Sequence, residues 1–90
     1  MLTSDTLRGY IAAGLPCDHL EVHGDDGTHF EAIVVSRAFE GKRLIQRHQL
    51  VYAALGERMR AEIHALSMKT LTPEEFAQRT GAAPGSGPAA

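Results

Sequence analysis

The strongest constraint on the fold is a pair of β-like segments separated by a short turn. His19–His23 alternates polar and apolar residues, and Thr28–Ser36 is longer and rich in β-branched side chains. Gly24-Asp25-Asp26-Gly27 separates them, and both residue types tolerate the positive φ angles of tight turns. The pattern predicts an antiparallel hairpin over about residues 18–36. In its second strand we expect Phe30, Ala32 and Val34 on one face and His29, Glu31, Ile33 and Val35 on the other.

Helical patterns flank this hairpin. The opening segment offers Thr3 or Ser4 as a helix N-cap, and it is expected to end at Gly14–Pro16 with glycine in the C-cap conformation. After a tight connection at 39–43, a second helix is predicted from about Leu44 to Leu55. Gly56 predicts a break or kink, after which the helix could resume towards Ile63. The apolar stripe of this helix contains Leu44, Val51 and Leu55, with His48 on it and Ile45, Tyr52 and Met59 beside it.

The last third of the chain adds one strand and one helix. Ile63–Leu71 reads as the strand. Thr72 then fits an N-cap, Pro73 the first helical position, and Glu75 the third position of a capping box. This helix is expected to reach about Thr80. Residues 81–90 are uncharged and rich in Ala, Gly and Pro, so we expect a disordered tail.

The element order is therefore helix, strand, strand, helix, strand, helix. It predicts a small α+β fold in which a three-stranded sheet carries helices on one face. The hairpin and the third strand must be joined by the central helical crossover. A chain of 90 residues allows one such domain.

The composition excludes several function classes. One cysteine excludes an internal disulfide framework and a thiolate metal site built from this chain alone. A net charge of −2 argues against gripping nucleic acid by bulk charge. Phosphate loops and nucleophile motifs are absent, and neither Cys17 beside His19 nor the Asp25-Asp26 turn resembles a catalytic site. We expect a non-enzymatic protein that is cytoplasmic, because no export signal or membrane-spanning run is visible.

Five histidines in so short a chain are the unusual feature. His19 and His23 fall on the polar side of the first strand, and His48 is expected to pack with one satisfied ring nitrogen. His29 and His64 stand at the starts of the second and third strands. If these strands are neighbours running in the same direction, the two side chains could converge. Two imidazoles are only half of a four-coordinate metal site, so the missing ligands would come from another molecule.

The order and spacing of five segments resemble the BolA family over about residues 3–80. The segments are Gly24–Ser36, Phe39-Glu40-Gly41-Lys42, Gln46–Tyr52, Ile63–Ser67 and Thr70–Phe76. Within the family the chain is most similar to the bacterial IbaG-like group, which has a similar Gly-Asp-Gly-Ser-His-Phe turn. One departure is Phe76, where the family usually has tryptophan. The resemblance implies a domain over 3–80 with a fold like a class II KH domain.

The resemblance also implies a partner and a cofactor. BolA-like proteins pair with monothiol glutaredoxins of the Cys-Gly-Phe-Ser type and share a bridging 2Fe–2S cluster, for which the partner supplies its cysteine and that of glutathione. By position, His64 matches the family's ligand histidine and His29 the more variable second ligand. The isolated chain would then hold no cluster. Histidine ligands raise a cluster's reduction potential relative to thiolate. Imidazole must be neutral to bind, so its ligation weakens as the pH falls, and such a labile cluster suits iron–sulfur trafficking, iron homeostasis or a stress response.

Two other functions remain open at this point. KH-like folds bind single strands through a Gly-x-x-Gly loop, and some BolA-like proteins are described as transcriptional regulators. Lys42, Arg43 and Arg47 could then contact phosphates of DNA, although the second glycine is missing and Glu40 adds a negative charge. The other alternative is a protein-interaction module without a cofactor. The free chain is expected to be a monomer or a weak homodimer, with no membrane contact.

Overall fold

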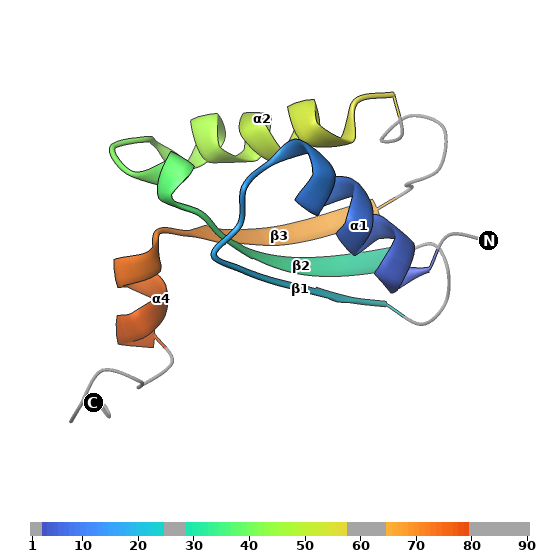
Figure 1. Cartoon of the computed structure of the whole chain (residues 1–90), viewed down its shortest axis with the longest axis horizontal. Helices are drawn as coiled ribbons and strands as arrows, with labels where there is room; N and C mark the ends of the chain where they lie inside the picture. The colour runs from blue at the N-terminus through green and yellow to red at the C-terminus, as the bar shows by residue number, and fades with distance from the viewer. Residues whose placement is uncertain (1–2, 25–28, 58–64, 80–90) are drawn as a thin grey trace.

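The computed structural model describes residues 3–24, 29–57 and 65–79 (Figure 1). Its elements are α1 (Ser4–Gly14), β1 (His19–His23), β2 (His29–Val35), the 3₁₀ helix η1 (Arg37–Phe39), α2 (Leu44–Leu55), β3 (Ala65–Leu71) and α4 (Pro73–Arg79). This order confirms the α+β fold predicted from the sequence. The predicted ends of two strands, at Thr28 and Ile63, lie outside the described residues, as does the tail 81–90.

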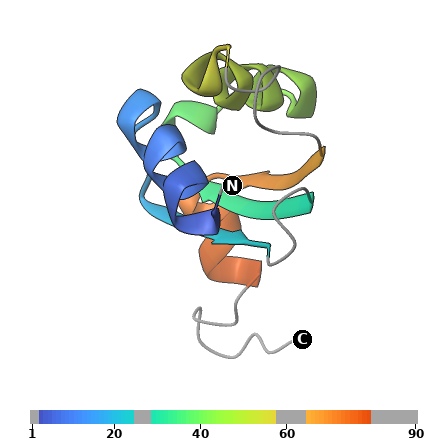
Figure 2. The ribbon, with the colours of Figure 1, turned by 90° about the vertical axis from the view of Figure 1, so that its right-hand side faces the viewer.

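The three strands form one mixed sheet in the order β1-β2-β3. β1 pairs antiparallel with β2, which confirms the hairpin, and β2 pairs parallel with β3. Parallel pairing requires a crossover between the two strands, and the α2 segment supplies it. Helices α1 and α2 lie on one face of the sheet, and α4 lies at the end of β3 towards the other face (Figures 1 and 2). We call the face opposite α1 and α2 the open face.

The core lies between the sheet and the helices α1 and α2. The two helices contribute Leu7, Ile11, Val51 and Leu55, the sheet contributes Leu20, Phe30, Ala32 and Val34, and the connections contribute Leu15 and Phe39. The alternation predicted for β2 is therefore confirmed. One expectation for α2 is wrong, because Leu44 is 62% exposed although it shares a stripe with two buried residues. The buried residues of α2 all lie towards its C-terminal end, so the helix packs on the core through that half.

The sequence predicted four features that begin or end a helix, and the structure confirms three of them. Thr3 caps α1 by accepting a hydrogen bond from the Thr6 amide at 3.1 Å. Gly56 ends α2 with a φ of 60°, and Thr72 and Glu75 form both hydrogen bonds of the capping box, at 2.9 and 3.2 Å. The C-cap prediction for Gly14 is wrong, because this glycine is the last residue of α1 and lacks a positive φ.

Gly14 is needed for a different reason, which is the close approach of α1 to α2. A Cβ atom built on Gly14 would lie 2.8 Å from both the Cα and the Cβ of Ala54. Contacts of that length between carbon atoms are strongly repulsive, so any larger residue would push the two helices apart. Gly9, in the same helix, has no such neighbour within 4 Å.

These two glycines allow a matched prediction. Gly14→Ala is expected to destabilise the protein by about 1–3 kcal/mol, because the overpacking outweighs the gain in helix propensity. Gly9→Ala is expected to stabilise it by up to about 1 kcal/mol, because only the propensity term operates. Urea denaturation followed by far-UV circular dichroism measures both. Equal effects of the two substitutions would contradict the close helix contact.

Candidate functional site

His29 is the first residue of β2, and its side chain is exposed. Phe30 and Ala32 point into the core, so the alternation of the strand places His29 on the open face. The imidazole is thus anchored to the central strand of the sheet and accessible from outside the domain. This is the geometry expected for a side chain that a partner molecule must reach.

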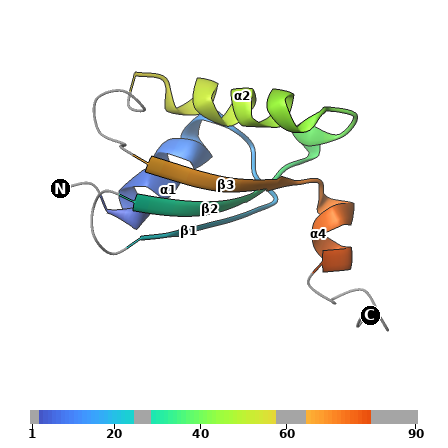
Figure 3. The same ribbon diagram turned by 180° about the vertical axis from the view of Figure 1, so that it is seen from behind.

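His64 lies outside the described residues, but the residue after it does not. Ala65 begins β3 and is the parallel register partner of His29. Neighbouring strands lie about 4.8 Å apart, so the backbone on the C-terminal side of His64 runs beside His29. The sequence argument required two neighbouring strands with the same direction, and β2 and β3 meet that requirement at the same end of the sheet (Figure 3).

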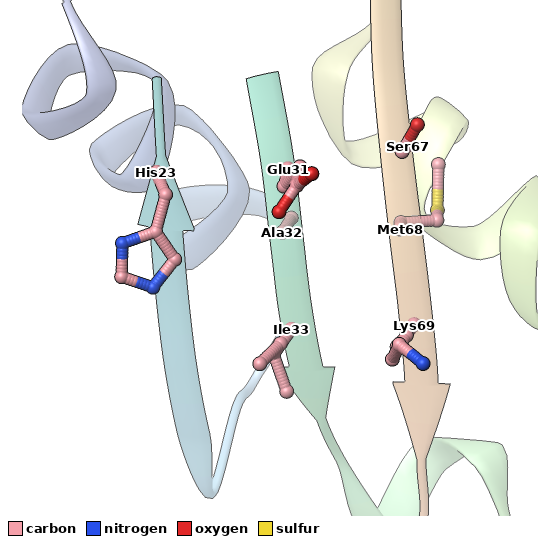
Figure 4. A pocket seen from close by; sticks show the side chains of 7 residues that line it. All are labelled: His23, Glu31, Ala32, Ile33, Ser67, Met68 and Lys69. Atoms are coloured by element: carbon pink, nitrogen blue, oxygen red, sulfur yellow. The ribbon is translucent and has the colours of Figure 1, made fainter. Parts of the chain in front are cut away.

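A shallow pocket of about 240 Å³ adjoins this end of the open face (Figure 4). Ile33 contributes an apolar side chain, Glu31 and Lys69 contribute opposite charges, and His23 and Ser67 contribute an imidazole and a hydroxyl group. The register places Glu31 between His23 and Ser67, and Ile33 beside Lys69. The surface next to His29 therefore offers groups of both charges around an apolar centre, which suits a polar protein contact better than a buried apolar ligand.

The polar side of β1 holds a second histidine group. Glu21 accepts hydrogen bonds from the Nε2 atoms of His19 and His23, at 2.6 and 3.1 Å. These bonds hold the pKa of the Glu21 carboxyl below its usual value. The His19 ring also stacks on Phe76 of α4, with 4.5 Å between ring centroids. The prediction that both histidines lie on the polar side of the strand is confirmed, and their spacing of two residues from Glu21 was the available signal for the bonds.

Two other candidate residues, Cys17 and His48, are partly buried in the domain. Cys17 is partly buried, its thiol donates to the Leu15 carbonyl oxygen at 3.3 Å, and burial followed by the charge of Asp18 raises its pKa. A raised pKa disfavours the thiolate that nucleophilic chemistry needs. The Nε2 atom of His48 is buried without a hydrogen-bond partner. No group of three or more potential metal-binding side chains occurs among the residues that the structure describes.

The three predicted phosphate contacts separate into two kinds. Lys42 and Arg43 are exposed before the first turn of α2. Arg47, in contrast, is only 14% exposed, because its guanidinium group is bound to Glu75 at 2.8 Å and to the carbonyl oxygens of Lys42 and Thr70. Its donors already hold α2, β3 and α4 together, which makes Arg47 the least available of the three predicted phosphate contacts. Sequence reasoning missed this role because Glu75 is 28 residues away.

A comparison with models of protein families identifies the family of this chain. The sequence model described as BolA-like protein matches residues 15–75, which include β1, β2, α2 and β3. This chain belongs to the BolA family. Protein BOLA2 of Arabidopsis thaliana is 46% identical over 80 residues, which cover 84% of this chain and 85% of the relative. BolA-like protein 2 of Mus musculus is 42% identical over 82 residues, which cover 87% of this chain and 94% of the relative.

A solved BolA homologue shows the same fold. The structure of a BolA protein homologue from Coxiella burnetii superposes with a TM-score of 0.73 at 44% sequence identity, covering 84% of this chain and 97% of that one. These BolA relatives come from a plant, an animal and a bacterium, so the family is established without singling out its IbaG-like group. Within the described residues, no helix has the length and apolar character needed to cross a bilayer.

Proposed function

We propose that this BolA-family protein is the partner of a monothiol glutaredoxin with a Cys-Gly-Phe-Ser active site. In the proposed heterodimer His64 and His29 would hold one side of a bridging 2Fe–2S cluster, and the partner's cysteine and glutathione would hold the other. The protein would act without enzymatic activity, in the cytoplasm, in iron–sulfur trafficking or iron homeostasis. Its placement in the IbaG-like group stays a prediction.

The observation that carries the proposal is the register between His29 and Ala65. It brings the start of β2, with an exposed imidazole, beside the residue that follows His64. The donor set fits the group, because imidazole nitrogen and thiolate sulfur are both established ligands of 2Fe–2S clusters. With His29 and His64 alone the chain offers half a site, which explains why a second molecule is required. When bound, the cluster would supply one-electron chemistry or be passed on.

The chain's own contribution is to position and expose these ligands. His29 is fixed to the central strand β2, which pairs with β1 over five residues and with β3 over seven. The pocket beside it, with Glu31 and Lys69, gives a partner surface both charges to pair with. Polar contacts of this kind favour correct orientation and rapid association more than raw affinity.

Co-expression with a Cys-Gly-Phe-Ser glutaredoxin tests the proposal. We expect a coloured heterodimer whose visible absorption and circular dichroism differ from those of the glutaredoxin alone. His64→Ala should lower the amount or lifetime of the shared cluster by at least about tenfold, since even groups that only orient metal ligands contribute 10–100-fold. His29→Ala should change the spectrum in the same direction.

His19→Ala is the matched control, because His19 is a histidine of the same sheet that lies outside the pocket, at the end of β1 that pairs with Val35 and away from His29. It should leave the cluster spectrum unchanged. An unchanged spectrum and lifetime for His64→Ala would overturn the ligand assignment. A colourless mixture without any complex would overturn the partnership itself and favour an interaction module that carries no cofactor.

Nucleic-acid binding is the less supported alternative. Its candidate surface keeps only Lys42 and Arg43, since Arg47 is engaged with Glu75. The salt dependence and affinity of nucleic-acid binding grow with the number of phosphates contacted, and two cations supply little of either. We therefore propose the glutaredoxin partnership and not DNA binding as the function.

A further inference from the structure

Gly24 follows β1 directly, and its surroundings leave no room for a side chain. A Cβ atom built on Gly24 would lie 2.6 Å from Cδ1 and 3.1 Å from Cε1 of Phe30, and 2.7 Å from the backbone carbonyl oxygen of His29. Carbon atoms pack best at about 3.5–4.0 Å, so these contacts are strongly repulsive. Backbone angles do not require this glycine, because the positive-φ glycines of the described residues are Gly41 and Gly56. Gly24 is therefore needed for the space it leaves.

The strand register shows what fills that space. His23 pairs with Glu31, so the next residues on the two strands, Gly24 and Phe30, face each other. A side chain at position 24 would point to the core side of the sheet, where Phe30 is only 2% exposed. The edge of the Phe30 ring thus occupies the place of the side chain that Gly24 lacks. A larger residue there has to move either this buried ring or the backbone at His29.

The second of these contacts concerns the aim of the His29 imidazole. The pairing of β2 with β1 ends at Glu31, whereas the pairing with β3 continues to His29 through Ala65. Gly24 therefore lies against the start of β2 on the side where strand pairing has ended. The carbonyl carbon is bonded directly to the His29 Cα atom. A shift of this carbonyl group consequently also shifts the Cα–Cβ bond that directs the imidazole.

We propose, building on the proposed function, that Gly24 is a positioning residue for His29. By leaving room for the Phe30 ring and the His29 carbonyl group, it fixes the direction in which the imidazole projects from the open face. A metal ligand is effective when it is held within about 0.5 Å of its productive position, and relieving these contacts requires a movement on the order of 0.5–1 Å. Groups that only orient metal ligands typically contribute about 10–100-fold to metal affinity.

Nuclear magnetic resonance of the free chain tests the geometry without a partner. The wild type should show strong nuclear Overhauser effects between the Hα protons of Gly24 and the ring protons of Phe30. Gly24→Ala should shift the carbonyl carbon and imidazole resonances of His29, because the new methyl group displaces the carbonyl. Unchanged His29 resonances in this variant would overturn the proposal, whether or not a glutaredoxin binds.

Gly14→Ala is the matched control. Its new methyl group meets Ala54 at a similar distance, 2.8 Å, but between α1 and α2, on the other side of the sheet from His29 (Figure 1). It should shift resonances around Ala54 and leave those of His29 in place. Equal shifts of the His29 resonances in Gly14→Ala and Gly24→Ala would assign them to a general loss of packing and overturn the positioning role.

Phe30→Leu in the Gly24→Ala background separates the two contacts and supplies a second variant with more room. The smaller side chain removes the aromatic ring and leaves the contact with the His29 carbonyl oxygen. The double variant should lose less in its urea midpoint than the sum of the losses of the two single variants, because both substitutions act on one space. Its His29 resonances should stay shifted. Additive losses would show that Gly24 and Phe30 do not share this space and would overturn the proposal.

The complex with the glutaredoxin tests the consequence for the cluster. Gly24→Ala should shorten the lifetime of the shared cluster by about tenfold and change its visible circular dichroism in the direction of His29→Ala. Gly14→Ala, which also lowers the stability of the domain, should change neither. A wild-type chain that binds no cluster would overturn the proposed function, while shifted His29 resonances in the free variant would still support the position of the imidazole. A cluster that His29→Ala alters and Gly24→Ala leaves as in the wild type would overturn the positioning role.

Discussion

Phe39→Ala is expected to destabilise the domain by about 3–5 kcal/mol, the range for removing a large aromatic side chain from a packed core. The Phe39 side chain is fully buried, although it comes from a three-residue 3₁₀ helix in a connection. Domains of this size are stable by roughly 4–13 kcal/mol, so the loss would unfold much of the protein near physiological temperature. The connection between β2 and α2 thus contributes to the core and does more than link two elements.

Urea denaturation followed by far-UV circular dichroism measures this effect, since the chain contains no tryptophan to report by fluorescence. Ile45→Ala is the matched control, because it also shortens a large apolar side chain but one that is 67% exposed. We expect its effect to stay within about 0.5 kcal/mol in dilute solution. A loss below about 1.5 kcal/mol for Phe39→Ala would show that the cavity collapses or that the ring packs less closely than its burial indicates.

The local rules of the sequence predicted the parts of the fold that depend on near neighbours. The alternation from His29 to Val34 identified which residues enter the core, because the side-chain period of a strand is two and one face is covered. Val35, predicted on the other face, is buried as well, which the alternation did not indicate. The spacing of Thr72 and Glu75 predicted both hydrogen bonds of the capping box, because the partners are three residues apart. The sequence also predicted a helical crossover between the hairpin and the third strand, whereas the parallel pairing of β2 with β3 is a finding of the structure.

Features that depend on distant partners could not be predicted in this way. Leu44 and Val51 share one helical stripe, yet only Val51 is buried, because periodicity identifies a face and not what lies beneath each turn of it. Gly14 reads as a helix terminator, but its role is set by Ala54, forty residues later in the chain. The same limit applies to the site. The sequence pointed to His29 and His64, and only the resemblance to the BolA family supplied the partner that completes the half-site.

Arg47→Ala is expected to cost about 2–3 kcal/mol, the second large loss of stability we predict. Its guanidinium group donates to the carbonyl oxygens of Lys42 and Thr70 at 3.0 and 3.1 Å and to Glu75 at 2.8 Å. Removal takes one donor from each of these acceptors in a part of the domain where Arg47 is only 14% exposed, although Glu75 still accepts from the Thr72 amide. The loss stays below that of a fully buried ion pair, because Glu75 is 45% exposed and can be hydrated.

Arg37→Ala is the matched control for this substitution. Arg37 also faces a carboxylate, with its Nε atom 3.3 Å from Asp18, but its side chain is 80% exposed. Exposed pairs contribute about 0–1 kcal/mol, so we expect a change within about 0.5 kcal/mol. Denaturation of both variants under identical conditions makes the comparison. Similar losses for the two arginines would show that burial of Arg47 adds nothing to its bonds.

The contribution of the Arg47–Glu75 pair to the free energy of unfolding should decrease as the pH is lowered. Hydrogen bonds from Arg47, and then from the Thr72 amide, hold the pKa of the Glu75 carboxyl below its usual value. A carboxyl whose pKa is lowered by folding stabilises the native state above its unfolded pKa, which is about 4.3, and loses that effect as the pH falls through the lower folded value. The stability difference between the wild type and Arg47→Ala should therefore be largest at pH 6–7 and shrink below about pH 4.

Glu75→Gln, which cannot ionise, should lose less stability than the wild type over the same acid range. A difference between wild type and Arg47→Ala that stays constant from pH 7 to pH 3 would assign the whole effect to the two carbonyl contacts and none to the charge of Glu75.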